Sequence, residues 1–247
     1  MRYALCASAL LVACIGASAT YAASSGQVPA YIQSAVDDQA RPDADRKRDA
    51  DRKPAQVLAF AGIKPGQKVA ELIPGGGYYT RLLCRIVGSG GQVYAVAVKM
   101  TRQMGGGANP ASGCNNITDS APSSTDLMLP EGVDVVWTSE NYHDLHNDLF
   151  GKPDMKAFDT AVFNALKPGG LYIIEDHVAE TGSGGRDAGT LHRIDPDLVK
   201  QEAMSAGFVY VGESRVLHNA NDNHTAKVFT MVDKTDRFLF KFRKPQS

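Results

Sequence analysis

The sequence lacks an excess of charge of either sign. Its 26 Lys and Arg residues face 27 Asp and Glu residues, which leaves a formal net charge of −1 over 247 residues. A strongly basic or acidic chain attracts nucleic acid or a charged membrane over long distances, and this balance supplies no such field. We therefore expect no nucleic-acid partner. The length allows one α/β domain with a full core, and no internal repeat is visible.

Long hydrophobic runs are also missing, with one short exception at the N-terminus. Residues 4–17 are almost wholly apolar, but a spanning helix needs roughly 18–20 such residues. The basic start at Arg2 and the small residues near Ala19 and Ala22 are typical of a secretory signal peptide. We predict a signal peptide over residues 1–22, export to the periplasm, and no transmembrane helix after cleavage.

Cysteine is scarce, and half of it falls in the signal region. Cys14 ends a segment that resembles a bacterial lipobox, so an alternative to simple secretion is lipidation at Cys14 and anchoring to a membrane. Cys84 and Cys114 remain in the body of the chain. In an oxidising compartment two cysteines can form a disulfide, and two unpaired thiols are the alternative.

The remaining chain divides into a charged segment and a folded domain. Residues 23–53 are polar and carry charges of both signs, which predicts a solvated N-terminal arm or helix. Residues 54–247 alternate buried strands with helices, and the central strands are continuous apolar runs. This pattern favours a parallel sheet covered on both faces, with the last two strands added as a hairpin at one edge. Strands are predicted over residues 68–72, 92–98, 116–118, 133–137, 171–175, 208–216 and 237–243, and the main helices over 55–61, 78–87, 154–166 and 197–206.

A glycine turn follows the first of these strands. Gly75, Gly76 and Gly77 lack Cβ atoms, so a ligand can approach the backbone closely. The free N–H groups of the next helix point at the same place and favour a polar or anionic group. Glu71 stands near the carboxyl end of the strand. Together these features predict a pocket for a nucleotide-type cofactor.

With these segments in place, the chain resembles the class I S-adenosylmethionine-dependent methyltransferases over residues 54–244. The resemblance rests on the strand that leads through Glu71 to the glycine turn, on the Leu-Lys-Pro-Gly-Gly segment at 166–170, and on the two terminal strands. It implies an α/β, three-layer, doubly wound, mostly parallel seven-stranded Rossmann-like sheet with an antiparallel last strand. Segments 52–54, 71–79 and 141–146 look like a group of bacterial methyltransferases with signal peptides.

The resemblance also assigns residues to the cofactor. In the family the glycine loop lies against the methionine part of S-adenosylmethionine, Ile73 stands where the first glycine usually is, and Lys99 occupies the place of the ribose-binding acid. Asn115, Asn116 or Asp119 would contact the adenine, and a tyrosine ring (Tyr78, Tyr79 or Tyr142) would face the sulfonium. The cofactor residues assigned in this way are Glu71, Pro74, Gly75, Gly76, Gly77, Tyr78, Lys99, Asn141 and Tyr142.

Histidines gather where the sheet would present its carboxyl edge. Ligands of doubly wound sheets bind beyond the carboxyl ends of the strands, and four of the six histidines follow two of these ends. They are His143, His146, His177 and His192. Methyl transfer to a small O- or N-nucleophile needs alignment and a base, and histidine suits the second task. We assign His143, oriented by Asp144, as the general base, and His177 with Asp176 as the second candidate.

A metal site is an alternative use of the same histidines. His143 and His146 are three residues apart and share a face if the segment is helical. With Asp144, Asp176 or His177 they could bind a divalent ion, yet the spacing lacks paired cysteines or an H-E-x-x-H motif. We therefore assign no metal. Histidines that cap a helix and bond to backbone are the simpler alternative.

Two other functions compete with methyl transfer. A nicotinamide oxidoreductase also has a glycine turn here, and Lys99 could accept the 2′-phosphate of NADP. However, Thr80 replaces the third glycine and no tyrosine–lysine catalytic pair is evident. An exported, non-catalytic Rossmann-like ligand-binding protein is the other alternative, because S-adenosylmethionine is made in the cytoplasm.

Overall fold

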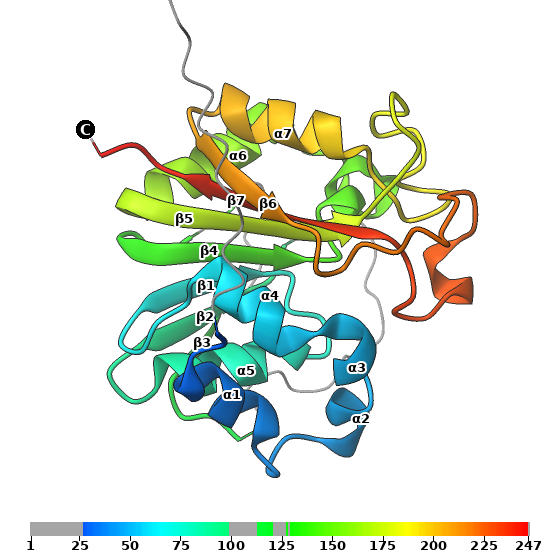
Figure 1. Cartoon of the computed structure of the whole chain (residues 1–247). Helices are drawn as coiled ribbons and strands as arrows, with labels where there is room; N and C mark the ends of the chain where they lie inside the picture. Colours follow the sequence, from blue (N-terminus) through cyan, green and yellow to red (C-terminus); the bar gives the residue numbers. More distant parts are fainter. Residues whose placement is uncertain (1–26, 99–112, 121–126, 128, 247) are drawn as a thin grey trace, which may run out of the picture.

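The computed structural model of the chain describes residues 27–98, 113–120, 127 and 129–246. Within these residues, seven strands form one sheet in the order β3-β2-β1-β4-β5-β7-β6 (Figure 1). The strands are β1 (Lys68–Leu72), β2 (Gln92–Val96), β3 (Ile117–Ser120), β4 (Val133–Ser139), β5 (Leu166–His177), β6 (Val209–Ser214) and β7 (Arg237–Arg243). Only β7 runs against its neighbours β5 and β6. The predicted fold class is confirmed.

Helices cover both faces of the sheet and complete three layers (Figure 1). One face carries α1 (Ala30–Asp37), α4 (Pro54–Ala61) and α5 (Tyr78–Val87), and the other carries α6 (Met155–Ala165) and α7 (Pro196–Ser205). Asp154 caps α6 by accepting the backbone N–H of Lys156, and Asp195 caps α7 by accepting that of Asp197. Short helices α2 (Asp43–Arg46), α3 (Asp49–Arg52), η1 (His143–His146), η2 (Asp148–Phe150) and η3 (Val228–Thr230) occupy the connections.

The core consists of two apolar clusters, one on each face of the sheet. Alternate residues of a strand point to opposite faces, so Val135 and Trp137 of β4 pack under α4 and α5, whereas Val136 packs on the α6 side. Trp137 is fully buried. Because the strands are buried on both faces, their sequences read as unbroken apolar runs.

Strand β5 is longer than the sequence predicts. We expected a helix to end at Leu166 and the strand to begin at Leu171, and the structure places residues 166–170 in the strand. The chain after β7 supplies the pairing, since Gly169 donates to the Lys244 carbonyl and Lys244 donates back to that of Gly170. A Cβ on Gly170 would lie 2.9 Å from the Lys167 carbonyl oxygen, so only glycine fits there.

The charged N-terminal segment forms short helices as expected, but some of its charged side chains are buried rather than solvated. Arg41, Asp45 and Arg52 are at most 8% exposed. Arg41 pairs with Asp49 at 2.7 Å, and Asp45 receives two bonds from Arg81 of α5 at 2.7 and 2.9 Å. Charges of both signs can be buried when they satisfy one another, and a mixed-sign sequence does not distinguish this arrangement from a solvated one. The segment is therefore part of the domain.

Cys84 of α5 and Cys114 form a disulfide, with their Cα atoms 6.3 Å apart. The structure thus selects this pairing over two free thiols. The predicted signal peptide, including Cys14, lies outside the described residues. Among the helices of the described part of the chain, none is long and apolar enough to cross a membrane.

Candidate functional site

A pocket of about 270 Å³ opens at the carboxyl ends of β1 and β4. Its walls include Arg52, Glu71, Ile73, Gly75, Gly76 and Asn141. A Cβ built on either glycine would meet nothing within 4 Å, so the turn leaves open space beside the backbone. The pocket therefore lies where a doubly wound sheet binds its ligands, and bare main chain at Gly75 and Gly76 forms part of its wall.

The turn after β1 requires unusual backbone angles. Ile73, Gly75 and Gly77 have φ values of +50°, +54° and +78°. A β-branched residue at positive φ is an outlier that costs on the order of 1–2 kcal/mol. Two hydrogen bonds hold Ile73 in place. The N–H of Ile73 donates to the Val96 carbonyl at 2.9 Å, and Asn141 Nδ2 donates to the Ile73 carbonyl at 2.8 Å. Isoleucine thus adopts the conformation that glycine would provide at this position, and the turn keeps its shape.

Helix α5 begins at this turn, and no side chain caps its first turn. Gly77 is its N-cap residue and offers no side-chain cap. The first N–H groups of a helix lack partners within the helix and carry a partial positive charge. They make the mouth of the pocket suitable for a carboxylate or another anionic group.

Glu71 is buried at the pocket wall without full pairing. It is 4% exposed, and no described residue provides a hydrogen-bond partner for its Oε2 atom. Burial raises the pKa of Glu71 to about 8, although Thr80, Arg81 and Arg52 act in the opposite direction. A carboxyl group with an unsatisfied oxygen at a pocket wall is suited to receive a cation or a donor from a ligand.

Arg52 connects the pocket to a buried charge network. Its guanidinium forms an ion pair with Glu140, and Arg237 binds the same carboxylate at 2.7 Å and Glu175 at 3.1 Å. Burial opposes ionisation of Glu140, but Arg52, His177 and Arg237 hold its pKa well below the ordinary range. Glu140 also has a positive φ of +58°. The network fixes the chain between the pocket and the histidines that follow.

Tyr78 lies at the predicted pocket, whereas Tyr142 does not. Tyr78 lines the pocket, but Arg52 already lies 4.6 Å from its ring centre and its hydroxyl donates to Asp49 at 2.6 Å. Tyr142 is fully buried and donates to Asp159 at 2.8 Å, inside the α6 side of the core. The cofactor contact assigned to Tyr142 is therefore wrong. Its neighbour Asn141 has the expected place at the pocket wall.

The carboxylate of Asp176 holds His143 in place. Asp176 lies at the end of β5, which is the second strand from β1 and its glycine turn. His143 is the first residue of η1, after β4, and Asp176 is the penultimate residue of β5. Asp176 accepts the backbone N–H of His143 at 2.7 Å and lies 2.8 Å from its Nδ1 atom. The orienting partner is thus Asp176, in place of the Asp144 that we predicted. With the proton on Nδ1, which donates to Asp176, the lone pair of the neutral ring is on Nε2.

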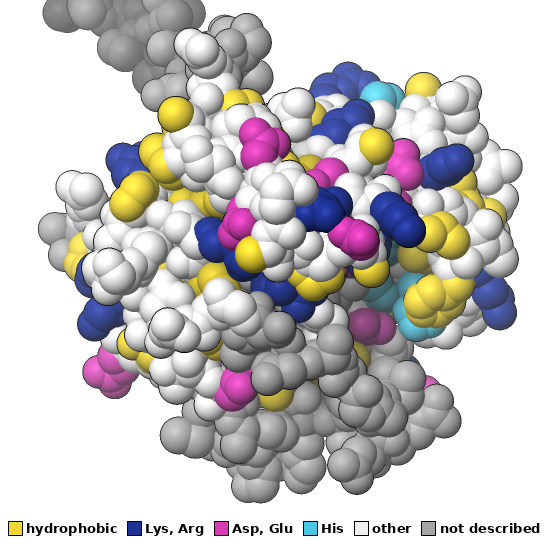
Figure 2. Space-filling view, turned by 90° about the horizontal axis from the view of Figure 1, so that it is seen from below, with side chains coloured by type: hydrophobic (Ala, Val, Ile, Leu, Met, Phe, Trp, Pro, Cys, Tyr) yellow, Lys and Arg dark blue, Asp and Glu magenta, His cyan; other side chains and the backbone are white. Residues whose placement is uncertain are grey.

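The other side of the His143 ring faces Asp144 and His192. Nε2 of His143 lies 3.2 Å from Nδ1 of His192 and 3.4 Å from an oxygen of Asp144. Burial lowers the pKa of His143, but Asp176 and Asp144 raise it by more than burial lowers it. The pKa of His143 therefore lies above the ordinary value. His192 and Asp144 are partly exposed, so the buried imidazole has a polar route to the surface. Figure 2 shows histidine side chains next to hydrophobic ones on one face of the molecule.

His177 and His146 do not join this group in the predicted way. His177 lies 5.9 Å from His143 between ring centres and bonds Thr235 at 2.7 Å. Burial lowers the pKa of His177 to about 4. His146 turns away and lies 3.1 Å from Glu202 of α7. A metal site that includes both His143 and His146 is therefore wrong, because His146 does not lie beside His143 at the site.

Several site residues could not be assigned from sequence. Arg48 and Arg52 reach the pocket from α3 and the turn before it, and Glu140 joins them from the end of β4. The dense charges at 43–52 were a signal for both arginines, and the resemblance of segment 52–54 was a second one for Arg52. Asn116, a candidate adenine contact, donates instead to the carbonyls of Cys84 and Gly88. Lys99 lies outside the described residues.

Comparison with solved structures places this fold among known ones. The chain is similar to a SAM-dependent methyltransferase from Aquifex aeolicus (19% identity, 82% of this chain, 98% of that chain, TM-score 0.56). It is also similar to an S-adenosylmethionine-dependent methyltransferase from Mesorhizobium loti (16% identity, 79% and 99%, TM-score 0.55). A third structure, the cyclase SpnF, is 15% identical over 85% of this chain and 86% of that chain, with a TM-score of 0.54.

These similarities establish the fold, which is the Rossmann-like sheet that methyltransferases use. No protein-family model matches the sequence, and no match to a curated protein is found. The presence of a cyclase among the similar structures agrees with the general rule that one fold hosts several reactions. Function is therefore argued from the site.

Proposed function

We propose that this protein transfers a methyl group from S-adenosylmethionine to a small molecule with an O- or N-nucleophile. One observation carries the proposal: the open glycine turn after β1 and the His143–Asp176 pair lie at the same edge of the sheet. Asn141 joins them, because it binds the turn at Ile73 and precedes His143 by two residues. A cofactor pocket and a base are thus neighbours.

The pocket residues fit the methionine part of S-adenosylmethionine. The Glu71 Oε2 atom needs a donor, and the ammonium group is one. Arg52 Nε, for which the described residues provide no acceptor, and the N–H groups at the start of α5 suit the carboxylate. The space beside Gly75 and Gly76 admits a chain close to the backbone. When bound, the cofactor supplies a methyl group on a positively charged sulfur.

The residues of this chain would hold the acceptor's proton. Asp176 fixes the ring of His143, and Nε2 takes the proton of a hydroxyl or protonated amine. His192 Nδ1, 3.2 Å from that nitrogen, can pass the proton towards solvent. His177 stays neutral at neutral pH because its pKa is about 4, which suits it as a neutral hydrogen-bonding group beside the base. Alignment within the pocket supplies the larger part of the rate.

Export to the periplasm belongs to this proposal, and it also supports the alternative. An exported Rossmann-like protein that binds a zwitterionic ligand without chemistry would use the same pocket, since the ion pairs of Arg48 and Arg52 already preform it. No described residue favours the NADP-type oxidoreductase. Thr80, at the place of its third glycine, is fully buried in α5.

The test measures formation of S-adenosylhomocysteine by mass spectrometry. The protein is incubated with S-adenosylmethionine and a small-molecule extract of the source cells. We expect product with the wild type and loss of turnover, with binding intact, in His143→Gln. The control is His218→Gln, which changes a histidine that bonds Asp236 outside the site. Cofactor binding without product across the extract would favour the non-catalytic alternative, and an unchanged rate in His143→Gln would refute the base.

A further inference from the structure

Three donor atoms from two parts of the chain converge beside the pocket. They are His143 Nε2, Asp144 Oδ1 and His192 Nδ1, all within 4.8 Å of one another. The three separations are 3.2 Å between the nitrogens, 3.4 Å from His143 to Asp144, and 3.6 Å from His192 to Asp144. His192 is 49 residues from His143, so no local sequence motif contains all three residues.

We propose that His143, Asp144 and His192 bind a divalent transition-metal ion of the zinc type. Zinc bonds to nitrogen and oxygen are about 2.0–2.2 Å long, so ligands at tetrahedral angles stand about 3.3–3.6 Å apart. A facial octahedral set at similar bond lengths would stand only about 3.0 Å apart. The separations of 3.2, 3.4 and 3.6 Å lie closer to the tetrahedral spacing than to the octahedral one. Two imidazoles, one carboxylate and an open fourth position are a typical donor set of catalytic zinc.

The neighbours of these ligands are those that metal sites use. Asp176 is fully buried, holds His143 at Nδ1, and so directs Nε2 to the ion. Asn147 donates to Oδ1 of Asp144, the proposed ligand atom itself, at 2.8 Å and orients that carboxylate. A histidine whose far nitrogen bonds a carboxylate is the usual form of a zinc ligand.

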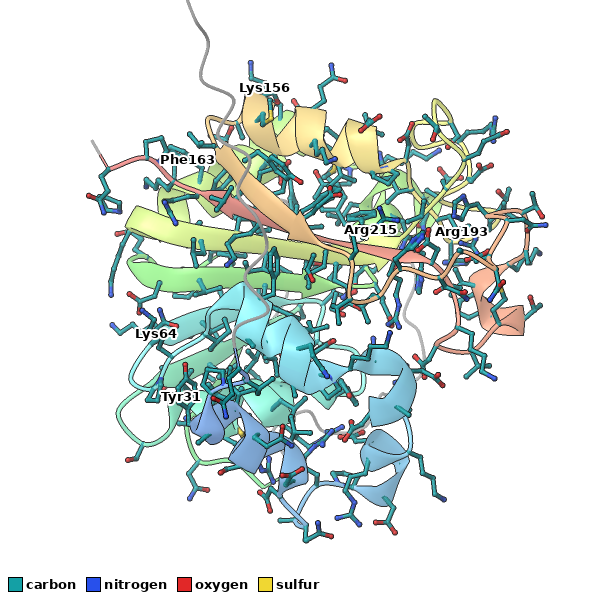
Figure 3. The ribbon with its side chains drawn as sticks, in the orientation of Figure 1. Tyr31, Lys64, Lys156, Phe163, Arg193 and Arg215 are labelled. Atoms are coloured by element: carbon teal, nitrogen blue, oxygen red, sulfur yellow. A yellow bond between two sulfur atoms is a disulfide. The ribbon has the colours of Figure 1, made fainter. Side chains whose placement is uncertain are left out.

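His192 is held in an unfavourable conformation that keeps its ring at the site. Its φ is +57°, and its ring packs against Phe229 with centres 4.5 Å apart. The next residue, Arg193, lies past the carboxyl end of β5 (Figure 3). It is fully buried and pairs with Asp222 at 2.9 Å. Such anchoring can maintain local backbone strain, which is a common feature of functional sites.

Metal binding goes beyond the proposed methyl transfer and does not depend on it. Without an ion, the nitrogens of His143 and His192 at 3.2 Å share one proton, and His143 is free to act as the base. With an ion bound, that lone pair is used, and the ion would lower the pKa of a hydroxyl acceptor at its open position. His192 and Asp144 are 25% and 20% exposed, so the open side faces an accessible region.

The experiment titrates zinc into tag-free protein that has been treated with a chelator and dialysed. We expect one ion per chain by calorimetry, and an intense visible absorption when cobalt replaces zinc, as tetrahedral sites give. His192→Gln and Asp144→Asn should each weaken binding at least about tenfold. His146→Gln is the matched control, because it removes the i+3 histidine that bonds Glu202. It should bind zinc like the wild type.

Two results would overturn the metal site. One is a folded wild-type protein that takes up no zinc, which would mean that the two histidines only share a proton. The other is binding that His146→Gln weakens and His192→Gln does not. If His192→Gln fails to fold, Asp144→Asn decides, since Asp144 is partly exposed. The titration contains no S-adenosylmethionine, so its failure is separate from a failure of the proposed methyl transfer.

Discussion

Asp176 holds His143 by both its backbone and its ring. One carboxylate oxygen accepts the His143 N–H at 2.7 Å and the other lies 2.8 Å from Nδ1. The second oxygen also accepts the N–H of His177 at 2.7 Å. The carboxylate thus fixes the position, the ring orientation and the tautomer of the residue that we propose as the base.

Asp176→Asn should lower turnover by about 10²–10⁴-fold, because an amide no longer enforces the tautomer with a basic Nε2. Affinity for S-adenosylmethionine should change little, since Asp176 does not line the cofactor pocket. Single-turnover rates and calorimetry measure the two quantities. Asp197→Asn, an exposed carboxylate at the start of α7, is the control. A turnover loss below about threefold in Asp176→Asn would contradict the orienting role.

Glu71 should make the folded state lose stability as the pH rises. Burial raises its folded pKa to about 8, so the folded protein keeps a proton that the unfolded chain releases near pH 4.5. The stabilisation is fully present below the unfolded pKa and disappears as the pH rises through about 8. Denaturant unfolding of the wild type and Glu71→Gln at pH 5.5 and 8.5 measures the effect. The difference between the two proteins should shift by at least about 1 kcal/mol in favour of Glu71→Gln at the higher pH. No shift would mean that Glu71 ionises normally.

Ile73→Gly should be tolerated, unlike the same change at a core isoleucine. At φ +50°, glycine relieves strain that offsets the lost side-chain contacts and the extra freedom of the unfolded chain. We expect a change in the free energy of unfolding within about 1 kcal/mol. Ile63→Gly removes a fully buried side chain and should cost about 3–5 kcal/mol. Equal costs in denaturant unfolding would show that Ile73 is not strained.

Removal of the Cys84–Cys114 disulfide should lower stability by about 2–4 kcal/mol, because the link closes a loop with a sequence separation of 30. Thermal unfolding with and without a reducing agent measures this. The Cys84→Ser/Cys114→Ser protein should unfold at the same temperature in both conditions. If the unfolding temperature of the wild type were also the same with and without the reducing agent, the disulfide would be contradicted.

The fold follows from sequence where neighbouring segments decide the structure. Strand β1, helix α5 and strand β7 have the predicted bounds, because glycine turns or charged residues mark both ends of each element. The start of β5 could not be predicted, since it pairs with the tail around Lys244, far along the chain. The burial of Arg41 and Asp45 depends on partners in other helices in the same way.

The site was predictable only in part for the same reason. Glu71, the glycine turn, Asn141 and His143 stand at strand ends, where the topology brings them together. The spacing of His143 and His146 predicted a shared face. In the structure the His143 ring bonds Asp176 and the His146 ring bonds Glu202, so the two rings have different partners. His192 lies on a loop next to the buried Arg193–Asp222 ion pair. The periodicity of the sequence does not predict this pair, so it could not predict the position of His192.

Calorimetric titration of the folded protein with S-adenosylmethionine tests the central claim most directly. We expect saturable binding at one site, and loss of binding in Gly76→Val, whose side chain would enter the open space beside the turn. Gly90→Val is the control, because a Cβ there meets only the Gly66 Cα atom at 3.9 Å. No heat with S-adenosylmethionine or S-adenosylhomocysteine, or equal binding in Gly76→Val, would contradict the assignment of this pocket.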